Sequence, residues 1–301
     1  MLTCRALMGI SEAFYIPAAL ALITDFHTGN TRAKAVGIHQ SGIYAGLALG
    51  GIGGYIAQTS SWRNCFTWFG LAGVIYAVVL MLTLRDAPTS VSDKQNKNVA
   101  LLETLRALWS KPAFWILVIY FTLPAIAGWV TKNWLPTYLA DTFQLKEGPA
   151  GLSATGYIQI AAFLGVLIGG AVADWWMRRT NRGRIFTSAA GVLLIVPALL
   201  GLGYAWSLGA AIAFMILFGL GWGFFDCNNM PILCQIARPE HRATGYGFMN
   251  LVSISVGAGA TLALGWMRDH HVKFSMAFAI SAAVALLSAG LILLVKPSAE
   301  T

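Results

Sequence analysis

The sequence predicts an all-α membrane protein whose nine transmembrane helices form two bundles. Of its 301 residues, 57% are hydrophobic and only 11% are charged, whereas charged residues make up about a quarter of an ordinary soluble domain. The apolar residues gather in stretches of about 20, the length at which a helix crosses a bilayer. Two of these stretches share a sequence motif, which indicates a duplicated architecture.

The expected helices follow the apolar stretches in chain order. Three lie in a first block and six in a second, separated by one long connection that is polar from Pro88 to Asn98 and then amphipathic from Leu101 to Trp109. The nine expected spans are 5–24, 33–57, 65–84, 113–139, 151–174, 185–204, 209–234, 243–266 and 274–295. The domains expected from these spans are a three-helix block over 1–84, a cytoplasmic linker over 85–112, a six-helix bundle over 113–296 and a cytoplasmic tail over 297–301.

The distribution of basic residues predicts the orientation of the chain. The formal net charge is +8, but the positive residues lie in short loops between spans, so the charge does not indicate a nucleic-acid partner. If the loops alternate between the two sides of the membrane, one side holds all but six of the 20 basic residues, the six being Arg5, Arg63, Lys132, Lys146, Arg268 and Lys273. Cytoplasmic loops carry such an excess. We therefore expect a multi-pass protein of the plasma (inner) membrane with its C-terminus in the cytoplasm.

An internal repeat relates the two blocks. Residues 9–17 read G-x-x-E-x(4)-P, and residues 223–231 repeat this frame with Asp in place of Glu. Each copy is followed by Arg-Ala-x-x-x-Gly, at 32–37 and at 242–247. Internal symmetry of this kind is typical of membrane transporters. Three apolar helices precede the second motif and none precedes the first, so we expect that the chain lacks the first three helices of a twelve-helix arrangement.

The first copy of the motif contains candidate functional residues. Arg5 and Glu12 are two helical turns apart on nearly the same face, and Tyr15 extends that face. Ionisable side chains inside a membrane are costly and therefore suggest function. Burial disfavours the ionised carboxylate and a nearby guanidinium favours it, so Glu12 is a candidate for proton exchange. The alternative for Arg5 is that it extends its charged end to water at the outer interface.

The second copy supplies the mirror candidates. Asp226 and Asn229 are three residues apart on one face of the expected helix, while Asn228 points elsewhere. Pro231 removes a backbone donor just after them, and helix breaks of this kind expose carbonyls to a polar cavity. We expect Asp226 and Asn229 to line a central cavity; the alternative is that Asp226 satisfies the broken backbone of a neighbouring helix.

Lys132 and Asn133 lie near the outer end of the fourth span, flanked by Trp129 and Trp134. The tryptophans are typical of an interfacial aromatic belt. Lys132 is then either a contact for a substrate anion or a lysine that reaches lipid headgroups.

Other polar and small residues favour structural explanations. His39 could titrate near neutral pH, but near a cytoplasmic helix end hydration is the simpler reading. The glycine-rich run 46–54 suits close helix packing rather than nucleotide binding. His270 and His271 are adjacent and make a poor metal site, and the four cysteines form no metal or disulfide pattern. We therefore expect no metal and no cofactor.

A loop in the second block resembles a signature of the major facilitator superfamily. It reads Gly-x(3)-Asp174 followed by Arg178, Arg182 and Arg184, and it lies between the second and third helices of the block, as in that superfamily. It departs from the signature in having Trp175 where a basic residue is usual. The resemblance implies a two-bundle fold and a gating role for Asp174 with its arginines, steadying one end of the transport cycle.

Further segments are similar to families within that superfamily. The segment from Arg5 to Pro17, the Trp62-Arg63…Phe66 stretch and residues 133–138 resemble the anion:cation symporters, which include sugar-acid permeases and sialin. The Gly-x-x-Glu-Ala segment also resembles spinster-type transporters of lipids and organic solutes. The resemblance implies that Glu12 takes part in proton coupling and that Arg5 binds a substrate carboxylate or pairs with Glu12.

These observations together predict a secondary active transporter that works by alternating access. Its expected activity is proton-coupled symport of a small organic anion such as a sugar acid, with protons and membrane lipid as further partners and a monomer as the working oligomeric state. The alternatives are a spinster-like transporter of lipids or amphiphiles, and a nine-helix remnant that transports nothing. Enzyme motifs such as HExxH and G-x-S-x-G do not occur, so we do not expect an enzyme.

Overall fold

The computed structural model describes residues 32–85 and 101–296, together with the isolated positions 3, 4, 7, 15, 19, 22, 23 and 26. The expected first helix, 5–24, therefore lies outside the described residues except at a few positions. Everything with regular structure in the described part is helical, with no strand. Backbone contacts divide the chain into two compact units, one made of 1–46 with 65–97 and the other of 47–64 with 98–301.

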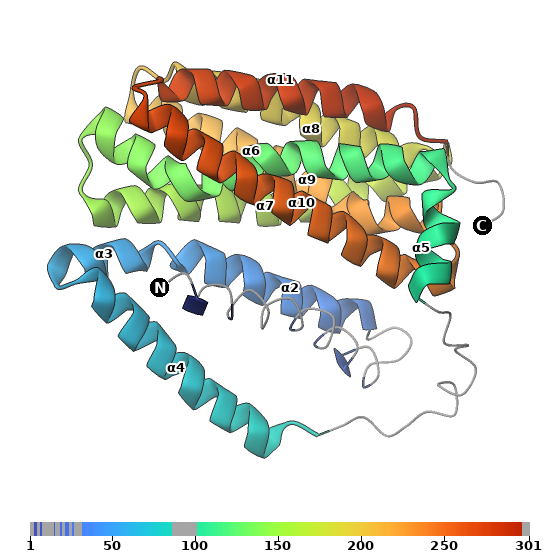
Figure 1. The fold of residues 1–301 in the computed structure, drawn as a ribbon, viewed down its shortest axis with the longest axis horizontal. Coiled ribbons are helices and arrows are strands. Elements are labelled where there is room, and N and C mark those ends of the chain that lie inside the picture. The colour runs from blue at the N-terminus through green and yellow to red at the C-terminus, as the bar shows by residue number, and fades with distance from the viewer. Residues whose placement is uncertain are drawn as a thin grey trace. The chain divides into compact units, whose positions relative to one another are not determined.

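The second unit is built on six long helices that lie side by side and run in alternating directions, along the horizontal axis of Figure 1. They are α6 (Pro112–Phe143), α7 (Glu147–Met177), α8 (Gly183–Gly203), α9 (Leu208–Cys234), α10 (Pro239–Asp269) and α11 (Phe274–Ile292). With α4 (Trp62–Thr83), they are the seven described helices that are long and apolar enough to cross a membrane. The expected all-α membrane fold is confirmed. Helices α6, α7 and α10 extend past the expected spans, since their helical structure includes polar residues beyond the apolar stretch. Helix α11 ends earlier than expected.

Helix α9 is at the centre of this unit, where it packs against α7 and α8, while α10 and α11 pack against α6. The contact between α7 and α9 is close because glycine faces backbone. A Cβ atom added at Gly223 would lie 2.3 Å from the carbonyl oxygen of Ala162 and 2.5 Å from the nitrogen of Val166. Small residues allow such an approach between membrane helices. The largest fully buried side chains include Tyr120, Phe114 and Phe225, so the aromatic core lies between α6 and α9.

The expected single helix over 33–57 is wrong. The structure has two helices there, α2 (Arg32–Leu49) and α3 (Ile52–Thr59), separated at Gly50 and Gly51. Two successive glycines disfavour a continuous helix because each costs about 1 kcal/mol relative to alanine.

Helix α3 packs against the start of α7. A Cβ atom at Gly51 or Gly54 would come within 2.6 Å of α7 backbone atoms. Thr155 donates from Oγ1 to the carbonyl of Ala48 at 3.1 Å, and the amide of Gly148 donates to Gln58 Oε1 at 3.1 Å. The packing explanation of the glycine-rich run is therefore confirmed for its second part, and residues 47–64, which we grouped with the first block, make their contacts with the second unit.

Helix α4 supplies the longest described helix of the first unit. After Arg63 and Asn64 in the first turn, its residues are apolar apart from two threonines, and none of the 22 is buried. A helix that is hydrophobic all round is suited to lipid or to other helices rather than to water.

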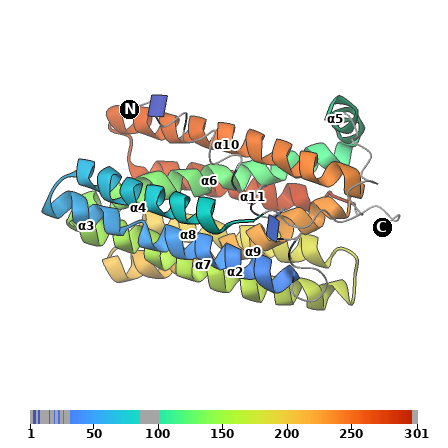
Figure 2. The same cartoon turned by 90° about the horizontal axis from the view of Figure 1, so that it is seen from below.

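The amphipathic part of the linker forms α5 (Leu101–Trp109), which lies across one end of the six-helix bundle (Figure 2). Leu108 is buried there, and Thr104 Oγ1 is 3.1 Å from His241 Nδ1 at the start of α10. Lys111, just after α5, donates from Nζ to the carbonyl of Ile236 at 3.0 Å. We call this end, with α5, the 178–182 loop and the 235–238 turn, the basic end of the bundle.

Candidate functional site

The acid and amide of the second motif lie on α9, as the sequence predicts. Asp226 is partly exposed, and its charge is within electrostatic range of Tyr246 on α10. Asn229 is fully buried, and neither its amide nitrogen nor its oxygen has a hydrogen-bond partner among the described residues. Burying an unsatisfied amide costs free energy. The amide of Asn229 is therefore the described group on α9 with the most to gain from a new polar partner.

Asn228 behaves differently from Asn229. Its Nδ2 donates to the carbonyl of Phe224 at 2.9 Å and to Cys227 Sγ at 3.2 Å, so it bonds within its own helix. Its Oδ1, like the amide of Asn229, has no hydrogen-bond partner among the described residues. The cavity lining expected for Asp226 and Asn229 stays a prediction.

Arg242 caps the end of α9, a role that we did not predict from the sequence. Arg242 donates from Nε to the carbonyl of Ala237 at 3.1 Å and from Nη2 to that of Cys234 at 3.1 Å. The last carbonyls of a helix lack partners within the helix and carry partial negative charge, which a cation stabilises. The available signal was the repeat itself, which places an arginine after each Gly-acid-Pro motif.

A buried polar centre around Tyr120 joins four helices behind Asp226. The hydroxyl of Tyr120 on α6 hydrogen-bonds to Ser188 Oγ on α8, which is 3.4 Å from the carbonyl of Phe225 on α9. Ser288 on α11 donates from Oγ to the backbone carbonyl of Tyr120 at 2.9 Å. This carbonyl needs an outside donor because the residue four positions later is Pro124, which has no amide hydrogen. The centre thus fixes the segment of α9 that carries Phe225 and Asp226.

An aromatic wall lies beside the acid. We define it as Phe121 of α6, Trp222 and Phe225 of α9, and Tyr246 of α10. The ring of Phe121 stacks on Phe225 at 5.9 Å between centroids and lies 6.0 Å from Tyr246, and Trp222 is 5.4 Å from Phe225. An apolar wall next to a carboxylate and an unsatisfied amide suits an organic molecule with both apolar and polar parts.

The predicted cation at the opposite end of the bundle is associated with tryptophan. Lys132 is exposed, and its Nζ lies 5.3 Å from the ring centroid of Trp129. Asn133 donates from Nδ2 to the carbonyl of Trp129 at 2.8 Å, so its amide is used within α6. Trp134 donates from Nε1 to the carbonyl of Thr261 at 3.2 Å. The tryptophans anchor α6 to α10, and Lys132 remains available to an anion or a headgroup.

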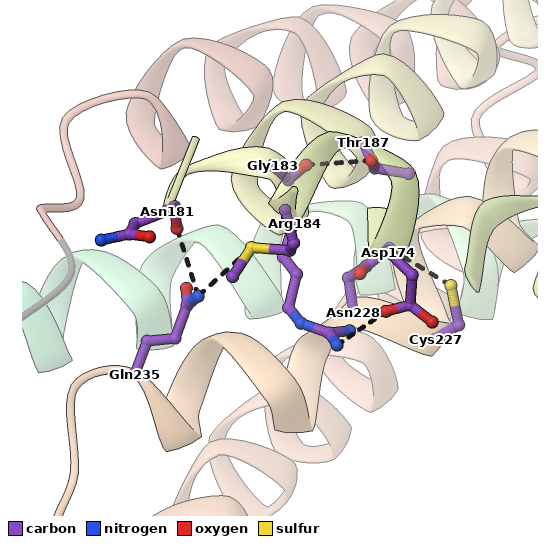
Figure 3. Close-up of polar contacts among 9 residues, drawn as sticks. Asp174, Asn181, Gly183, Arg184, Thr187, Cys227, Asn228 and Gln235 are labelled. Atoms are coloured by element: carbon purple, nitrogen blue, oxygen red, sulfur yellow. Dashed lines mark hydrogen bonds and ion pairs between the residues drawn. The ribbon is translucent and has the colours of Figure 1, made fainter. Parts of the chain in front are cut away.

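The loop between α7 and α8 forms an ordered corner at the basic end (Figure 3). Asp174 accepts from Arg184 Nη2 at 2.9 Å, which connects the end of α7 to the start of α8. Gln235 at the end of α9 donates from Nε2 to the carbonyl of Asn181 at 3.2 Å. Arg182 donates to the carbonyl of Leu293 after α11. The arginine run is therefore more than a solvated basic face, because Arg182 and Arg184 connect α7, α8 and α11, while Arg178 is exposed.

The candidates of the first motif are only partly described. Tyr15 is exposed, and its ring lies 5.8 Å from that of His39 on α2. Arg5 and Glu12 lie outside the described residues, so their roles stay predictions. Within the described part of the chain, no group of three or more His, Cys, Asp or Glu side chains could hold a metal ion.

Seven helices of the described part of the chain are long and apolar enough to cross a membrane, which defines a multi-pass helical membrane protein. The family model described as Major Facilitator Superfamily matches residues 1–261. The chain belongs to this superfamily, as its 170–184 loop predicts.

Similar proteins narrow the comparison further. Protein spinster homolog 1 of Bos taurus is 27% identical over 292 residues, which covers 89% of this chain and 55% of that protein. Probable anion transporter 5 of Arabidopsis thaliana is 25% identical over 265 residues, covering 79% of this chain and 60% of that protein. The chain thus spans little more than half the length of the curated relatives it matches.

A solved structure shares the fold. The crystal structure of a bacterial homolog of the human lysosomal transporter Spinster, inward-facing and unoccupied, matches with a TM-score of 0.66 at 18% identity. The match covers 94% of this chain and 76% of that chain. At this identity the likeness supports the fold alone.

Proposed function

We propose that the protein is a secondary active transporter that carries an organic anion across the membrane by alternating access. The observation that carries the proposal is the arrangement on α9, where an acid and a buried amide without a described partner adjoin the aromatic wall. Two bundles rocking about a site near the bilayer midplane is the mechanism that such folds support. Membership of the superfamily and the relative named as an anion transporter agree with this proposal.

Proton coupling is the finer part of the proposal and rests on Glu12. A carboxylate in a membrane span that exchanges a proton can couple substrate movement to a proton gradient. Arg5, Tyr15, Lys132, Asn133, Asp226 and Asn229 are the residues we propose for substrate contact. The loop with Asp174, Arg178, Arg182 and Arg184 is proposed to steady one end of the cycle. We place the protein in the plasma (inner) membrane with its C-terminus in the cytoplasm, from the distribution of its basic residues.

A second candidate substrate class is favoured by a specific observation. The rings of the aromatic wall surround the acid from three helices, and apolar surroundings of this kind suit a lipid or another amphiphile better than a sugar acid. The spinster relatives agree with this alternative, since one of them is named as a sphingosine-1-phosphate transporter in Xenopus tropicalis.

The test uses the protein isolated from its native membranes, after its intact mass has been compared with 32.3 kDa. Reconstituted in liposomes with an inward proton gradient, the protein should accumulate a labelled sugar acid, and a protonophore should abolish accumulation. Glu12→Gln should abolish coupled uptake, whereas Glu103→Gln, which removes an exposed carboxylate on α5, should not. Movement of a labelled lysophospholipid without need of a gradient would instead support the amphiphile alternative. No movement of either compound would refute both.

A further inference from the structure

The four arginines between α7 and α8 divide into two pairs with different surroundings. Arg182 and Arg184 are used inside the bundle, through Leu293 and Asp174. Arg178 and Arg179 are exposed, and among the described residues neither side chain has a hydrogen bond or an ion pair. The corner thus presents two positive charges that the described part of the chain does not neutralise.

Trp175 provides an aromatic surface next to these charges. Its side chain is exposed at the end of α7, and the guanidinium carbon of Arg179 lies 4.0 Å from its ring centroid. Tryptophan prefers the boundary between acyl chains and headgroups, where its ring is amphipathic. A guanidinium stacked on a ring keeps its hydrogen-bond donors at the edge of the plane, available to a phosphate.

An apolar stripe on α7 leads up to Trp175. Leu164, Ile168 and Ala171 are exposed and precede Trp175 at intervals of four, three and four residues, which places all of them on one helix face. The same spacing places Arg178 and Arg179 just beyond Trp175, on either side of the stripe. We call the stripe with Trp175 and the two arginines the lipid face.

The lipid face is turned away from the contact with α9. Gly165 and Gly169 lie about a quarter to a third of a turn round α7 from the stripe and are buried against α9, where a Cβ atom would meet α9 atoms at 2.5 and 2.9 Å. The lipid face is therefore a surface on which an apolar half nearer the bilayer centre is continuous with a cationic half at the helix end.

We propose that this face binds one anionic phospholipid, with its phosphate at Arg178 and Arg179, its ester region at Trp175 and an acyl chain along Leu164, Ile168 and Ala171. The charge complementarity selects an anionic headgroup, because two unneutralised arginines beside the membrane attract anionic lipid. The guanidinium groups bind phosphate oxygens by charge-assisted hydrogen bonds. A zwitterionic headgroup would set its own ammonium against the same arginines and binds less well.

Native mass spectrometry of the detergent-solubilised protein with added phosphatidylglycerol or phosphatidylcholine tests this site. The native sequence should retain one phosphatidylglycerol at concentrations where phosphatidylcholine is lost. Loss of two interfacial charges in Arg178→Gln/Arg179→Gln, at about 1 kcal/mol each, should weaken retention roughly thirtyfold. The matched control is Lys146→Gln/Lys273→Gln, which removes two exposed charges at the opposite end of the bundle and should leave retention unchanged.

Two further arms make the result decisive. Arg178→Lys/Arg179→Lys keeps both charges and should keep most of the binding, so it answers the question even if the glutamine variant folds poorly. Millimolar inorganic phosphate should not displace the lipid, because phosphate cannot use the apolar stripe. Undiminished retention by the glutamine variant, equal loss in the control, equal retention of phosphatidylcholine, loss in the lysine variant or displacement by phosphate would each overturn the proposal.

Discussion

The contact between Ser288 and the backbone of Tyr120 leads to a quantitative prediction about the six-helix bundle. Pro124 cannot donate to the carbonyl of Tyr120, and Ser288 Oγ replaces the missing amide at 2.9 Å. Ser288 is fully buried, so water does not take its place when the hydroxyl is removed. Ser288→Ala should therefore leave a buried carbonyl without a partner, which costs about 1–3 kcal/mol. Hydrogen bonds inside membrane proteins measure about 0.6 kcal/mol on average and up to about 1.7 kcal/mol, so we expect about 1.5 kcal/mol.

The same change should cost much less when the helix can satisfy itself. In Pro124→Ala, the amide of residue 124 can donate to the carbonyl of Tyr120 as in an ordinary helix. Ser288→Ala in that background should cost under about 0.5 kcal/mol, which gives a coupling free energy of about 1 kcal/mol between the two positions. The cycle removes any separate effect of straightening α6, since that effect is present in both Pro124→Ala proteins.

The free energy of unfolding can be measured by titrating sodium dodecyl sulfate into mixed micelles and following helicity by circular dichroism. Ser281→Ala serves as the control, because Ser281 is also buried on α11 but no hydrogen bond from it to a described residue is found. Its substitution should cost the same in both backgrounds. If Ser288→Ala destabilises the protein equally with and without Pro124, the carbonyl of Tyr120 does not depend on Ser288 and the reasoning is wrong.

Two further predictions use the same measurement. Gly223→Ala should lower the free energy of unfolding by about 2–3 kcal/mol through overpacking, because its Cβ atom would lie 2.3 Å from a carbonyl oxygen of α7. Gly170→Ala is the control and should be neutral or slightly stabilising, because its Cβ atom would meet no described atom within 4 Å. Equal losses in the two variants would refute the argument. Arg242→Gln should cost about 2 kcal/mol, since it removes charge-assisted bonds to Cys234 at the end of α9 and to Ala237 in the turn after it. Arg238→Gln, which removes an exposed arginine from the same turn, should cost little. A larger loss at Arg238 than at Arg242 would contradict the capping role.

The spans of the second block could be predicted because the bilayer imposes their length. An apolar stretch of about 20 residues has few alternatives to a spanning helix, and each of the six expected there became one. The break at Gly50 and Gly51 could not be predicted with the same security. A glycine in an apolar stretch permits both close packing and a helix end, and here neighbouring glycines do both, since the helix stops and Gly51 and Gly54 contact α7.

The polar contacts of the site were harder to predict than its residues. Asp226 and Asn229 stand out in the sequence because polar groups are rare in a membrane span. Ser288 does not, since its partner is 168 residues away and serine is unremarkable in a membrane helix. The signal that could have found it is Pro124, because a proline inside a helix leaves a carbonyl that must bond elsewhere. The sequence therefore indicates that the carbonyl of Tyr120 needs a partner, but only the packing of α11 on α6 identifies Ser288 as that partner.

The repeat yields the last prediction, because the structure gives one of its residues a physical role. Arg242 follows the Gly-acid-Pro motif of α9 and binds the carbonyls of Cys234, at the end of that helix, and of Ala237, in the turn after it. The first copy of the motif ends at Pro17 and is followed by Arg32 in the same Arg-Ala-x-x-x-Gly frame. We predict that Arg32 caps the helix expected over 5–24 in the same way. Arg32→Gln should then lower the free energy of unfolding by about as much as Arg242→Gln, roughly 2 kcal/mol, and Arg32→Lys should restore part of the loss because a lysine can still donate to one carbonyl. A neutral Arg32→Gln beside a costly Arg242→Gln would mean that the two copies share sequence without sharing this contact.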